Sequence, residues 1–167
     1  LPAPIDPLSY FNSREIDLHS VECGPSWRVQ RPDWDSIPGS KRPYFTKGEA
    51  LCCSCTNEIA TIRFSGTALA ALLTAGPDAG DLEVSVDGGP FRRERLRADY
   101  GELHYPYVQM LADDLPFGDH AVRLRMVKSD EPCRGSVVRI NRLYVNGGAR
   151  DFKSCATILN KEKKGLW

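Results

Sequence analysis

The sequence has little that points to nucleic acid or to membranes. Its 22 basic and 22 acidic residues cancel to a formal net charge of +0, so no overall electric field attracts nucleic acid or an anionic membrane. No apolar run approaches the roughly 20 residues that a membrane-spanning helix needs. We therefore expect neither a nucleic-acid partner nor membrane insertion. The N-terminal stretch LPAPIDPLSYF does not resemble a signal peptide, which is what we expect of a mature exported chain.

The sequence also lacks the motifs of a serine esterase. Such an enzyme needs a Ser nucleophile, in a G-D-S or G-x-S-x-G context, and an Asp three residues before a catalytic His. Neither serine motif occurs, and no Asp stands three residues before His19, His104 or His120. Because triads are also assembled from distant positions, this argues against catalysis by the chain without excluding it.

Six cysteines allow more than one interpretation. Three cluster in the stretch LCCSC and three are scattered: Cys23, Cys52, Cys53, Cys55, Cys133 and Cys155. A zinc site usually takes two C-x-x-C pairs, or one pair with histidines at fixed spacing, and no histidine clusters with CCSC. Disulfides in an exported protein and buried free thiols that act as small apolar side chains both remain open.

One glycine-rich stretch, GPDAGDLEVSVDGGPF from Gly76 to Phe91, allows three interpretations. A phosphate cradle needs glycines between a strand and a helix, and a helix-loop-helix calcium site needs alternating acidic residues with a distal Glu. Neither pattern is present. The alternating LEVSV segment instead indicates a core strand between tight turns, with Gly88 or Gly89 at a positive φ. We expect no cofactor; a structural calcium ion stays an open alternative that no motif supports.

Alternation of apolar and polar residues dominates the middle of the chain. The stretches EIATIRFSG, LEVSVDGG and HAVRLRMV predict strands with one buried face. TALAALLTA is continuously apolar and fits a covered strand or a short buried helix; the flanking Gly66 and Gly76-Pro77 favour a strand. In SVVRINRLYVNGG the phase changes across Asn141-Arg142, which indicates a β-bulge or a change of partner sheet. The expected core residues are Ile62, Phe64, Leu72, Val84, Val86, Val122, Leu124, Ile140 and Leu143.

About eight strands with regular turns, and no convincing helix before residue 150, predict an all-β fold. We expect an antiparallel β-sandwich, a jelly roll with a long N-terminal loop region. Residues 1–48 are expected to be an N-terminal extension and loops packed on the sandwich, with only WRVQ suggesting a strand. The sandwich core is expected over 49–148 and a tail or linker over 149–167, all in one structural domain.

Several motifs taken together resemble a known family. FSGTALAALLTAGPDAGDLEVSVDGGPF, LHYPYVQMLADDLPFGDHAVRLRM and the closing RINRLYVNG resemble the non-catalytic β-sandwich domain beside the hydrolase domain of many bacterial SGNH/GDSL-type esterases. The resemblance covers Ile59 to Gly147 and leaves out the N-terminal loops and the CCSC cluster. It implies a galactose-binding-like jelly roll, exported to the periplasm or the cell exterior, that works next to a carbohydrate-ester or acetyl-ester hydrolase domain.

A glycan-binding module is the first functional hypothesis. Such modules stack aromatic faces on sugar rings and place Asp, Asn, Arg or His around the hydroxyls. The stretch DYGELHYPY is dense in such residues, and we expect Trp34 to approach it. The candidate glycan-binding residues are Trp34, Tyr44, Arg97, Asp99, Tyr100, His104, Tyr105 and Tyr107. We expect His104→Ala and Tyr105→Ala to weaken binding with little change in melting temperature, although such aromatic residues are also typical of packing.

The alternative is a structural or docking domain with no ligand of its own, which needs only an interface patch. Its most visible feature is the strip of Arg92, Arg93, Arg95 and Arg97, which also fits the solvated face of an edge strand. A stand-alone carbohydrate-ester hydrolase is a third hypothesis, against which the missing motifs argue. The expected partners are therefore a polysaccharide and an adjacent hydrolase domain.

Overall fold

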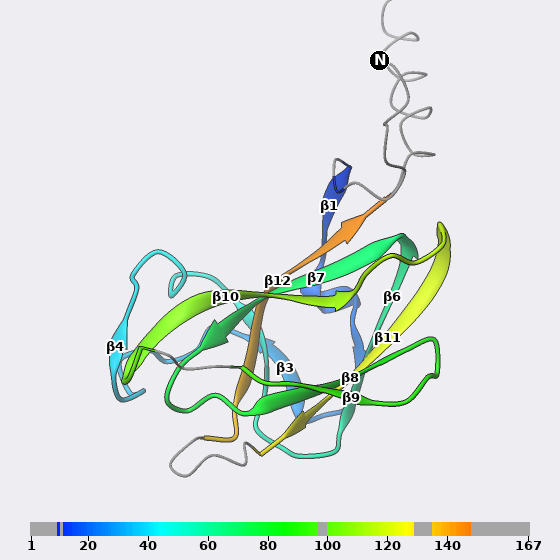
Figure 1. Ribbon diagram of the computed structural model, residues 1–167. Coiled ribbons are helices and arrows are strands. Elements are labelled where there is room, and N and C mark those ends of the chain that lie inside the picture. Colours follow the sequence, from blue (N-terminus) through cyan, green and yellow to red (C-terminus); the bar gives the residue numbers. More distant parts are fainter. Residues whose placement is uncertain (1–9, 11, 97–99, 129–134, 148–167) are drawn as a thin grey trace, which may run out of the picture.

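A computed structural model of the chain describes residues 10, 12–96, 100–128 and 135–147. These residues form strands and connecting loops, with a single short 3-10 turn, η1 (Leu18–Ser20) (Figure 1). The strands are β1 (Ser13–Ile16), β2 (Glu22–Cys23), β3 (Trp27–Gln30), β4 (Ser40–Lys41), β5 (Ala50–Cys53), β6 (Ile59–Gly66), β7 (Ala68–Ala75), β8 (Asp81–Val86), β9 (Arg92–Glu94), β10 (Leu103–Ala112), β11 (Gly118–Val127) and β12 (Val138–Asn146). None of the described segments is a helix long and apolar enough to cross a membrane.

The strands form two sheets that face each other as a sandwich. The seven-stranded sheet has the order β3-β5-β12-β7-β10-β4, with β1 added against β12, and the five-stranded sheet has the order β2-β6-β11-β8-β9. Apart from the parallel contact between β10 and β4, the paired strands are antiparallel. This confirms the all-β, jelly-roll sandwich that the sequence predicts.

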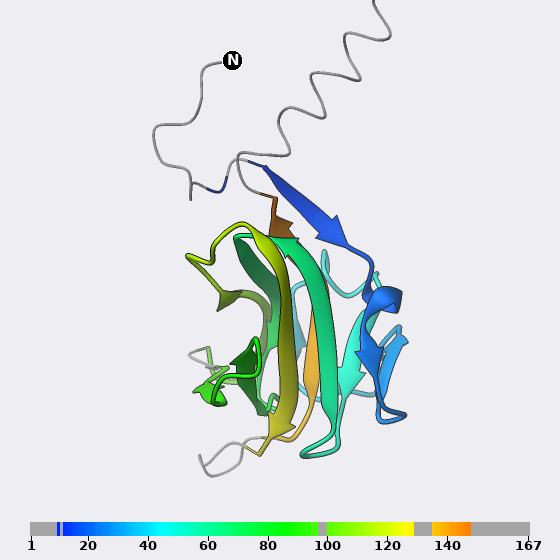
Figure 2. The same cartoon turned by 90° about the vertical axis from the view of Figure 1, so that its right-hand side faces the viewer.

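The N-terminal segment contributes strands as well as loops. The stretch WRVQ forms β3, as expected, and pairs with β5 at the edge of the seven-stranded sheet. β1, β2 and β4 are short additions that join β12, β6 and β10. In Figure 2 the blue elements β1, η1 and β2 lie along one side of the sandwich. β2 and β4 have two residues each, too few for a visible alternation, and β1 is as long as β3 but does not alternate between buried and exposed residues, which is why the sequence shows only β3.

The core lies between the sheets and follows the predicted alternation in most strands. Of the expected core residues, Ile62, Phe64, Val84, Val122, Leu124, Ile140 and Leu143 are buried. Leu72 is a correction: it is only half-buried, whereas Leu69, Ala71 and Leu73 face the core. In the continuously apolar stretch of β7 the sequence carries no signal for which residues point inward. Val86 is also half-buried and packs at the margin of the core.

Two local features appear where the sequence predicts them. The register of β12 against β7 shifts between Ile140 and Arg142, which is the irregularity indicated by the change of phase. In the turn between β8 and β9, Asp87 has φ +49° and Gly88 has φ +79°. The Gly89 amide donates to the Val86 carbonyl at 2.8 Å and closes the turn. Two successive positive φ angles give the turn geometry that matches the twist of a hairpin.

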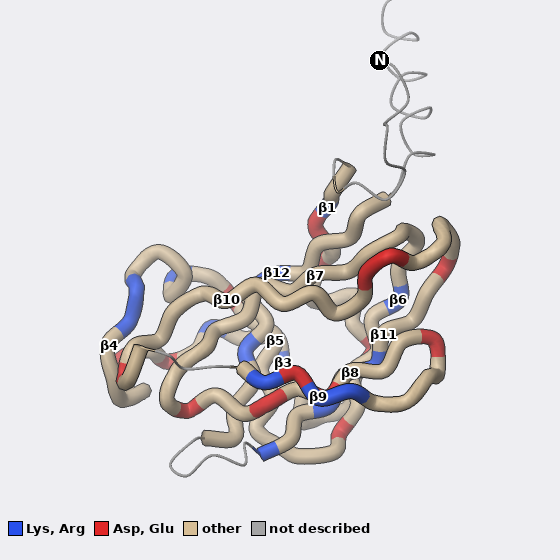
Figure 3. The backbone as a smooth tube through the Cα atoms, in the orientation of Figure 1, with Lys and Arg blue, Asp and Glu red and all other residues tan. Residues whose placement is uncertain are grey.

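Arg92 and Arg93 of the arginine strip lie on an edge strand, as one of its two interpretations expected, and Arg95 directly follows that strand. β9 is the last strand of the five-stranded sheet, and charges of both signs surround it in Figure 3. Arg92 pairs with Glu94, and Arg93 pairs with Asp81 at 3.0 Å. The charges of Arg92 and Arg93 are thus balanced by neighbouring carboxylates, and they suit an edge that must not pair with other chains. Arg97 lies outside the described residues.

Candidate functional site

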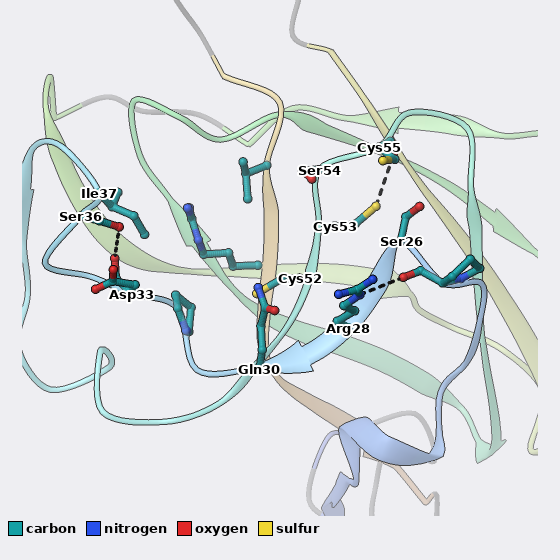
Figure 4. Close-up of a pocket in the computed structure, with 14 residues that line it drawn as sticks. Ser26, Arg28, Gln30, Asp33, Ser36, Ile37, Cys52, Cys53, Ser54 and Cys55 are labelled. Carbon is teal, nitrogen blue, oxygen red and sulfur yellow. Dashed lines mark hydrogen bonds between the residues drawn. The ribbon is translucent and has the colours of Figure 1, made fainter.

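A pocket of about 540 Å³ lies on the outer face of the seven-stranded sheet. Strands β3, β5 and β12 form its floor, and the loop between β3 and β4 forms one wall (Figure 4). Much of its lining is polar: Ser26, Arg28, Gln30, Asp33, Ser36, Ser54 and Arg139. Its volume falls within the range of about 300–1,000 Å³ that is usual for small-molecule sites.

Register places three side chains of the floor in one row. Cys52 pairs directly with Arg28 on one side and with Arg139 on the other. Because neighbouring strand residues face opposite sides of a sheet, Leu51 and Cys53 belong to the core while Cys52 lies on the outer face; Cys53, at the end of β5, also borders the pocket. The period of the strand therefore gives the floor one thiol between two arginines.

The Cys52 thiol is a poor nucleophile despite its arginine neighbours. Burial raises its pKa more than the charge of Arg139 and a hydrogen bond from Gln30 lower it. The thiol is therefore protonated at neutral pH, and it donates to the Ala50 carbonyl at 3.5 Å. In the pocket, the Cys52 thiol therefore contributes part of the floor surface and a weak hydrogen-bond donor.

The wall of the pocket is a tight turn with polar groups. The amide of Ser36 donates to the Asp33 carbonyl at 3.2 Å and its hydroxyl donates to the same oxygen at 2.9 Å. These bonds leave the Asp33 carboxylate exposed at the rim. In Figure 4, Asp33 and Ser36 lie across the pocket from Arg28. A ligand between them meets an acceptor on one side and a cationic donor on the other.

Trp34 packs the wall loop against the seven-stranded sheet. Its ring is buried and packs edge-on against Phe45, with centroids 5.4 Å apart, and against His104 at 5.7 Å. The Arg139 guanidinium lies 5.2 Å from the same ring, which is a cation–π distance. The sequence-based expectation that Trp34 approaches the DYGELHYPY stretch matches its contact with His104.

A carboxylate beneath Trp34 joins three distant segments. The Asp78 carboxylate accepts hydrogen bonds from both terminal nitrogens of Arg139, at 3.0 and 2.7 Å. Its Oδ1 atom also lies 2.9 Å from His104 Nε2. The other ring nitrogen of His104 lies 3.4 Å from the Ser40 carbonyl. Gly76 belongs to the same arrangement, because a Cβ at this position would lie 2.4 Å from His104 Cδ2. The GPDAG motif therefore supplies both the carboxylate and the space for the imidazole.

The pKa of the Asp78 carboxyl is held well below its ordinary value. Partial burial acts to raise it, but hydrogen bonds from His104 and Arg139 and the positive charge of Arg139 outweigh that effect. The carboxylate is therefore ionised over the whole neutral range and compensates the buried guanidinium.

The structure places two of the predicted glycan-binding residues in the interior. His104 is 0% exposed, so its ring has no face on which a sugar can stack, and Trp34 is only 8% exposed. Their role in this structure is packing and hydrogen bonding beneath the pocket wall. The ring-stacking role expected for His104 is corrected accordingly, whereas for Trp34, which borders a second hollow, it stays a prediction.

The predicted tyrosines lie in two separate places. Tyr44 is 68% exposed and packs against Phe45 next to Trp34, with ring centroids 5.9 Å apart. Tyr100 is 66% exposed and contacts the half-buried Tyr105 edge-on at 4.9 Å. Tyr107 packs against the core. Arg97 and Asp99 lie outside the described residues.

Sequence reasoning missed the polar residues of the pocket itself. Arg28 and Gln30 alternate with buried residues along β3, so their outward direction can be read from WRVQ. Nothing in the local sequence shows that they share a sheet face with Arg139, because that depends on the strand order β3-β5-β12.

A second hollow of about 410 Å³ adjoins the first. The two share Pro32 and Asp33, and the second is further lined by Arg31, Trp34, Asp35 and Thr46. The wall loop therefore has a polar hollow on each side, and Tyr44 lies two residues from Thr46.

The chemistry of these groups is suited to binding. In the described part of the chain, no serine or cysteine side chain is hydrogen-bonded to a histidine. The same residues contain no cluster of three or more His, Cys, Asp or Glu side chains that fits a metal ion. The pocket offers hydroxyl, amide, guanidinium and carboxylate groups, which are the partners of sugar hydroxyls.

No family model matches the sequence, and no curated protein matches it either. Solved structures do match in fold. A two-domain esterase (CEX) active on acetylated mannans, co-crystallized with mannopentaose, superposes with a TM-score of 0.61 at 16% identity, over 89% of this chain and 39% of the esterase. A family two carbohydrate esterase from Clostridium thermocellum, in complex with cellohexaose, gives a TM-score of 0.50 at 15% identity, over 77% of this chain and 32% of the esterase.

These matches show a shared fold. The chain spans only 39% and 32% of the two esterases, so it resembles one part of each. The sandwich predicted from the sequence is thus a fold found within carbohydrate esterases.

Proposed function

We propose that the chain is a glycan-binding accessory domain of an exported esterase system of the SGNH/GDSL type. The observation that carries the proposal is the pocket on the outer face of β3, β5 and β12, with the acceptor Asp33 in its wall and the cationic donor Arg28 in its floor. The motif resemblance and the fold shared with parts of carbohydrate esterases support the context. On this proposal the hydrolase is a neighbouring domain, and the sandwich is galactose-binding-like.

The arrangement suits a polysaccharide segment of more than one sugar. The two hollows share Asp33, so a chain that crosses the wall loop can engage both. Tyr44 offers the exposed aromatic ring that the pocket floor lacks. Arg28, Gln30 and Asp33 are exposed and lie where hydroxyl groups of a bound sugar would meet them.

The test is affinity electrophoresis and calorimetry of the wild-type chain against acetylated mannan, deacetylated mannan, xylan and a soluble cellulose derivative. Retention by at least one polysaccharide is expected. The double variant Gln30→Ala and Asp33→Ala should weaken that binding about thirtyfold or more, since two lost hydrogen bonds at about 1 kcal/mol each remove about 2 kcal/mol of binding free energy.

Arg28→Ala and Arg95→Ala form a matched pair, because both arginines are exposed and only Arg28 lines the pocket. Weaker binding in Arg28→Ala alone supports the site. Equal weakening in both points to non-specific charge effects. If the wild-type chain migrates unchanged in every polysaccharide, the glycan proposal fails.

The second candidate is a docking domain with no ligand of its own. It is favoured by the outer face of β10, where Val108 is 65% exposed beside the half-buried Met110 and opposite the half-buried Leu72 of β7. A large exposed aliphatic side chain on a sheet face is more typical of an interface than of a sugar site. A chain that binds no polysaccharide but associates with its hydrolase domain, and loses that association in Val108→Asp, would establish this function instead.

A further inference from the structure

Three cysteines lie close together at one corner of the sandwich. Cys23 is the last residue of β2, Cys53 is the last residue of β5, and Cys55 follows two residues later. All three are free thiols; Cys23 and Cys55 are exposed, whereas Cys53 is buried. β2 belongs to the five-stranded sheet and β5 to the seven-stranded sheet. The corner is therefore a place where one covalent bond can join the two sheets.

Strand pairing brings Cys23 to Cys53. Trp27 stands directly opposite Cys53 in the pairing of β3 with β5, and both side chains belong to the core. Cys23 Sγ lies 3.7 Å from the carbonyl oxygen of Trp27. The Cys23 thiol thus contacts the backbone of the residue that neighbours Cys53 across the sheet.

Glu58 fixes this arrangement. Its carboxylate accepts the Ser26 amide at 3.0 Å and its carbonyl accepts Trp27 Nε1 at 2.9 Å. The turn between β2 and β3 is therefore held against the segment that follows β5. Burial raises the pKa of both the Cys23 and the Cys53 thiols, and the charge of Glu58 raises them further.

The other cysteines of the cluster are less suitable partners. Cys53 Sγ donates to the backbone carbonyl of Cys55 at 3.2 Å, but a Cys53–Cys55 bond would have to close across the single residue Ser54, which strains a disulfide. Cys52 lies on the opposite face of β5, in the pocket floor.

We propose that Cys23 and Cys53 are an oxidation site that forms a disulfide between the two sheets. The oxidant is a low-molecular-weight disulfide. The exposed Cys23 loses its proton and attacks one oxidant sulfur, which releases one thiolate and leaves a mixed disulfide on Cys23. Cys53 then loses its proton and attacks the Cys23 sulfur, which releases the second thiolate. The two cysteines lose two electrons and two protons, and the oxidant becomes two thiols.

The order of events follows from exposure, since only Cys23 of the pair is accessible to a dissolved oxidant. The raised thiol pKa values make the reaction slow at neutral pH and faster as pH rises toward 9. The product stabilises the fold, because it restricts the unfolded chain between β2 and β5.

The experiment treats the full chain with oxidised glutathione at about pH 8.5, digests it without reduction and maps cross-linked peptides by mass spectrometry. A Cys23–Cys53 peptide is expected, and the oxidised protein should melt about 5 °C or more above the reduced protein. Cys23→Ser should abolish both effects. Cys55→Ser, the matched change at an exposed thiol, should preserve both.

Other results overturn the proposal. These are a cross-link from Cys23 to Cys55, a cross-link of Cys53 to Cys133 or Cys155, or an oxidised chain with unchanged melting temperature. Because Cys23 is exposed, the Cys23→Ser variant is expected to fold, and its melting temperature under reducing conditions checks this directly. Polysaccharide binding is not needed for any of these readouts.

Discussion

The Nε2 atom of His104 lies 2.9 Å from Oδ1 of Asp78, beneath Trp34 of the loop that forms the pocket wall. The same carboxylate accepts hydrogen bonds from both terminal nitrogens of the buried Arg139. The three residues come from the loop after β7, from β10 and from β12, so this contact holds three segments of the seven-stranded sheet in place. A histidine that looks like a sugar contact in the sequence is in the structure a packing and hydrogen-bonding element.

Asp78→Ala should destabilise the protein by about 3 kcal/mol or more. The change leaves the Arg139 guanidinium buried without its counter-charge, and the loss of one partner of a buried pair is costly. His104→Ala should also lower the melting temperature, because it opens a cavity under Trp34. Urea unfolding of both variants checks this, with the exposed Asp33→Ala as control. Midpoints equal to wild type in both would show that the network contributes nothing to stability.

This expectation reverses the one drawn from the sequence, and the reason is physical. In DYGELHYPY the alternation tells which residues share a face, and Tyr105 and Tyr107 do share one. It does not show that the opposite face, with His104, is covered by the loop that carries Trp34. That cover depends on contacts between residues far apart in the chain, to which local patterns are blind.

The same distinction separates the predictable from the unpredictable parts of the fold. The bulge in β12 and the positive φ at Gly88 depend on a few neighbouring residues, and the sequence predicts both. The direction of Leu72 and the assembly of Arg28, Cys52 and Arg139 into one pocket floor depend on the sheet pairing and the strand order. Only the structure supplies these.

Acid should weaken the protein through Asp78. The pKa of Asp78 is lower in the folded than in the unfolded state. As the pH falls below about 4, the unfolded chain therefore binds more protons than the folded chain does. The stabilisation is therefore complete above the unfolded pKa and declines as the pH falls from there toward the folded pKa. Asp78→Asn removes this group, so the stability difference between wild type and variant should shrink between about pH 6 and pH 3. A difference that stays constant over this range would contradict the assignment.

His120 should titrate above the ordinary value of 6.5. Its Nδ1 lies 2.7 Å from the Asp87 carboxylate and its Nε2 lies 2.8 Å from the Pro116 carbonyl, so both nitrogens face acceptors and the doubly protonated ring is favoured. Burial acts to lower the pKa of His120, but the Pro116 carbonyl and Asp87 outweigh it. NMR titration of the ring protons measures the pKa, and Asp87→Asn should lower it.

The raised pKa of His120 makes the stability of the fold depend on pH. The folded-state pKa of His120 is raised, so the contribution is fully present below the unfolded pKa and is lost as the pH rises through the folded pKa. An unchanged pKa of His120 in the Asp87→Asn variant would show that the carboxylate does not act on the ring.

Gly88→Ala should destabilise the hairpin between β8 and β9 by about 1 kcal/mol. A Cβ at Gly88 has nothing within 4 Å, so the cost comes from the backbone φ of +79° alone. Gly48→Ala is the matched control, because its Cβ would also meet nothing within 4 Å and its φ is not positive. Thermal unfolding should separate the two variants by a few degrees, and equal melting temperatures would mean that the turn relaxes without strain.

Two exposed tyrosines distinguish the possible locations of a glycan site. Tyr44 lies next to the wall loop of the pocket, whereas Tyr100 lies with Tyr105 in the DYGELHYPY stretch. Both rings are about equally exposed, at 68% and 66%, so Tyr44→Ala and Tyr100→Ala should cost little stability. Truncation of a ring that stacks on a sugar removes on the order of 1 kcal/mol or more, close to tenfold in affinity.

If the pocket is the site, calorimetry with the best polysaccharide fragment should show weaker binding for Tyr44→Ala and unchanged binding for Tyr100→Ala. The reverse pattern would move the site to the DYGELHYPY stretch and leave the pocket without a role in binding. Equal affinity in both variants and in wild type would mean that binding uses neither Tyr44 nor Tyr100. In that case the polar floor of Arg28 and Gln30 must account for the affinity by itself, which Arg28→Ala tests directly.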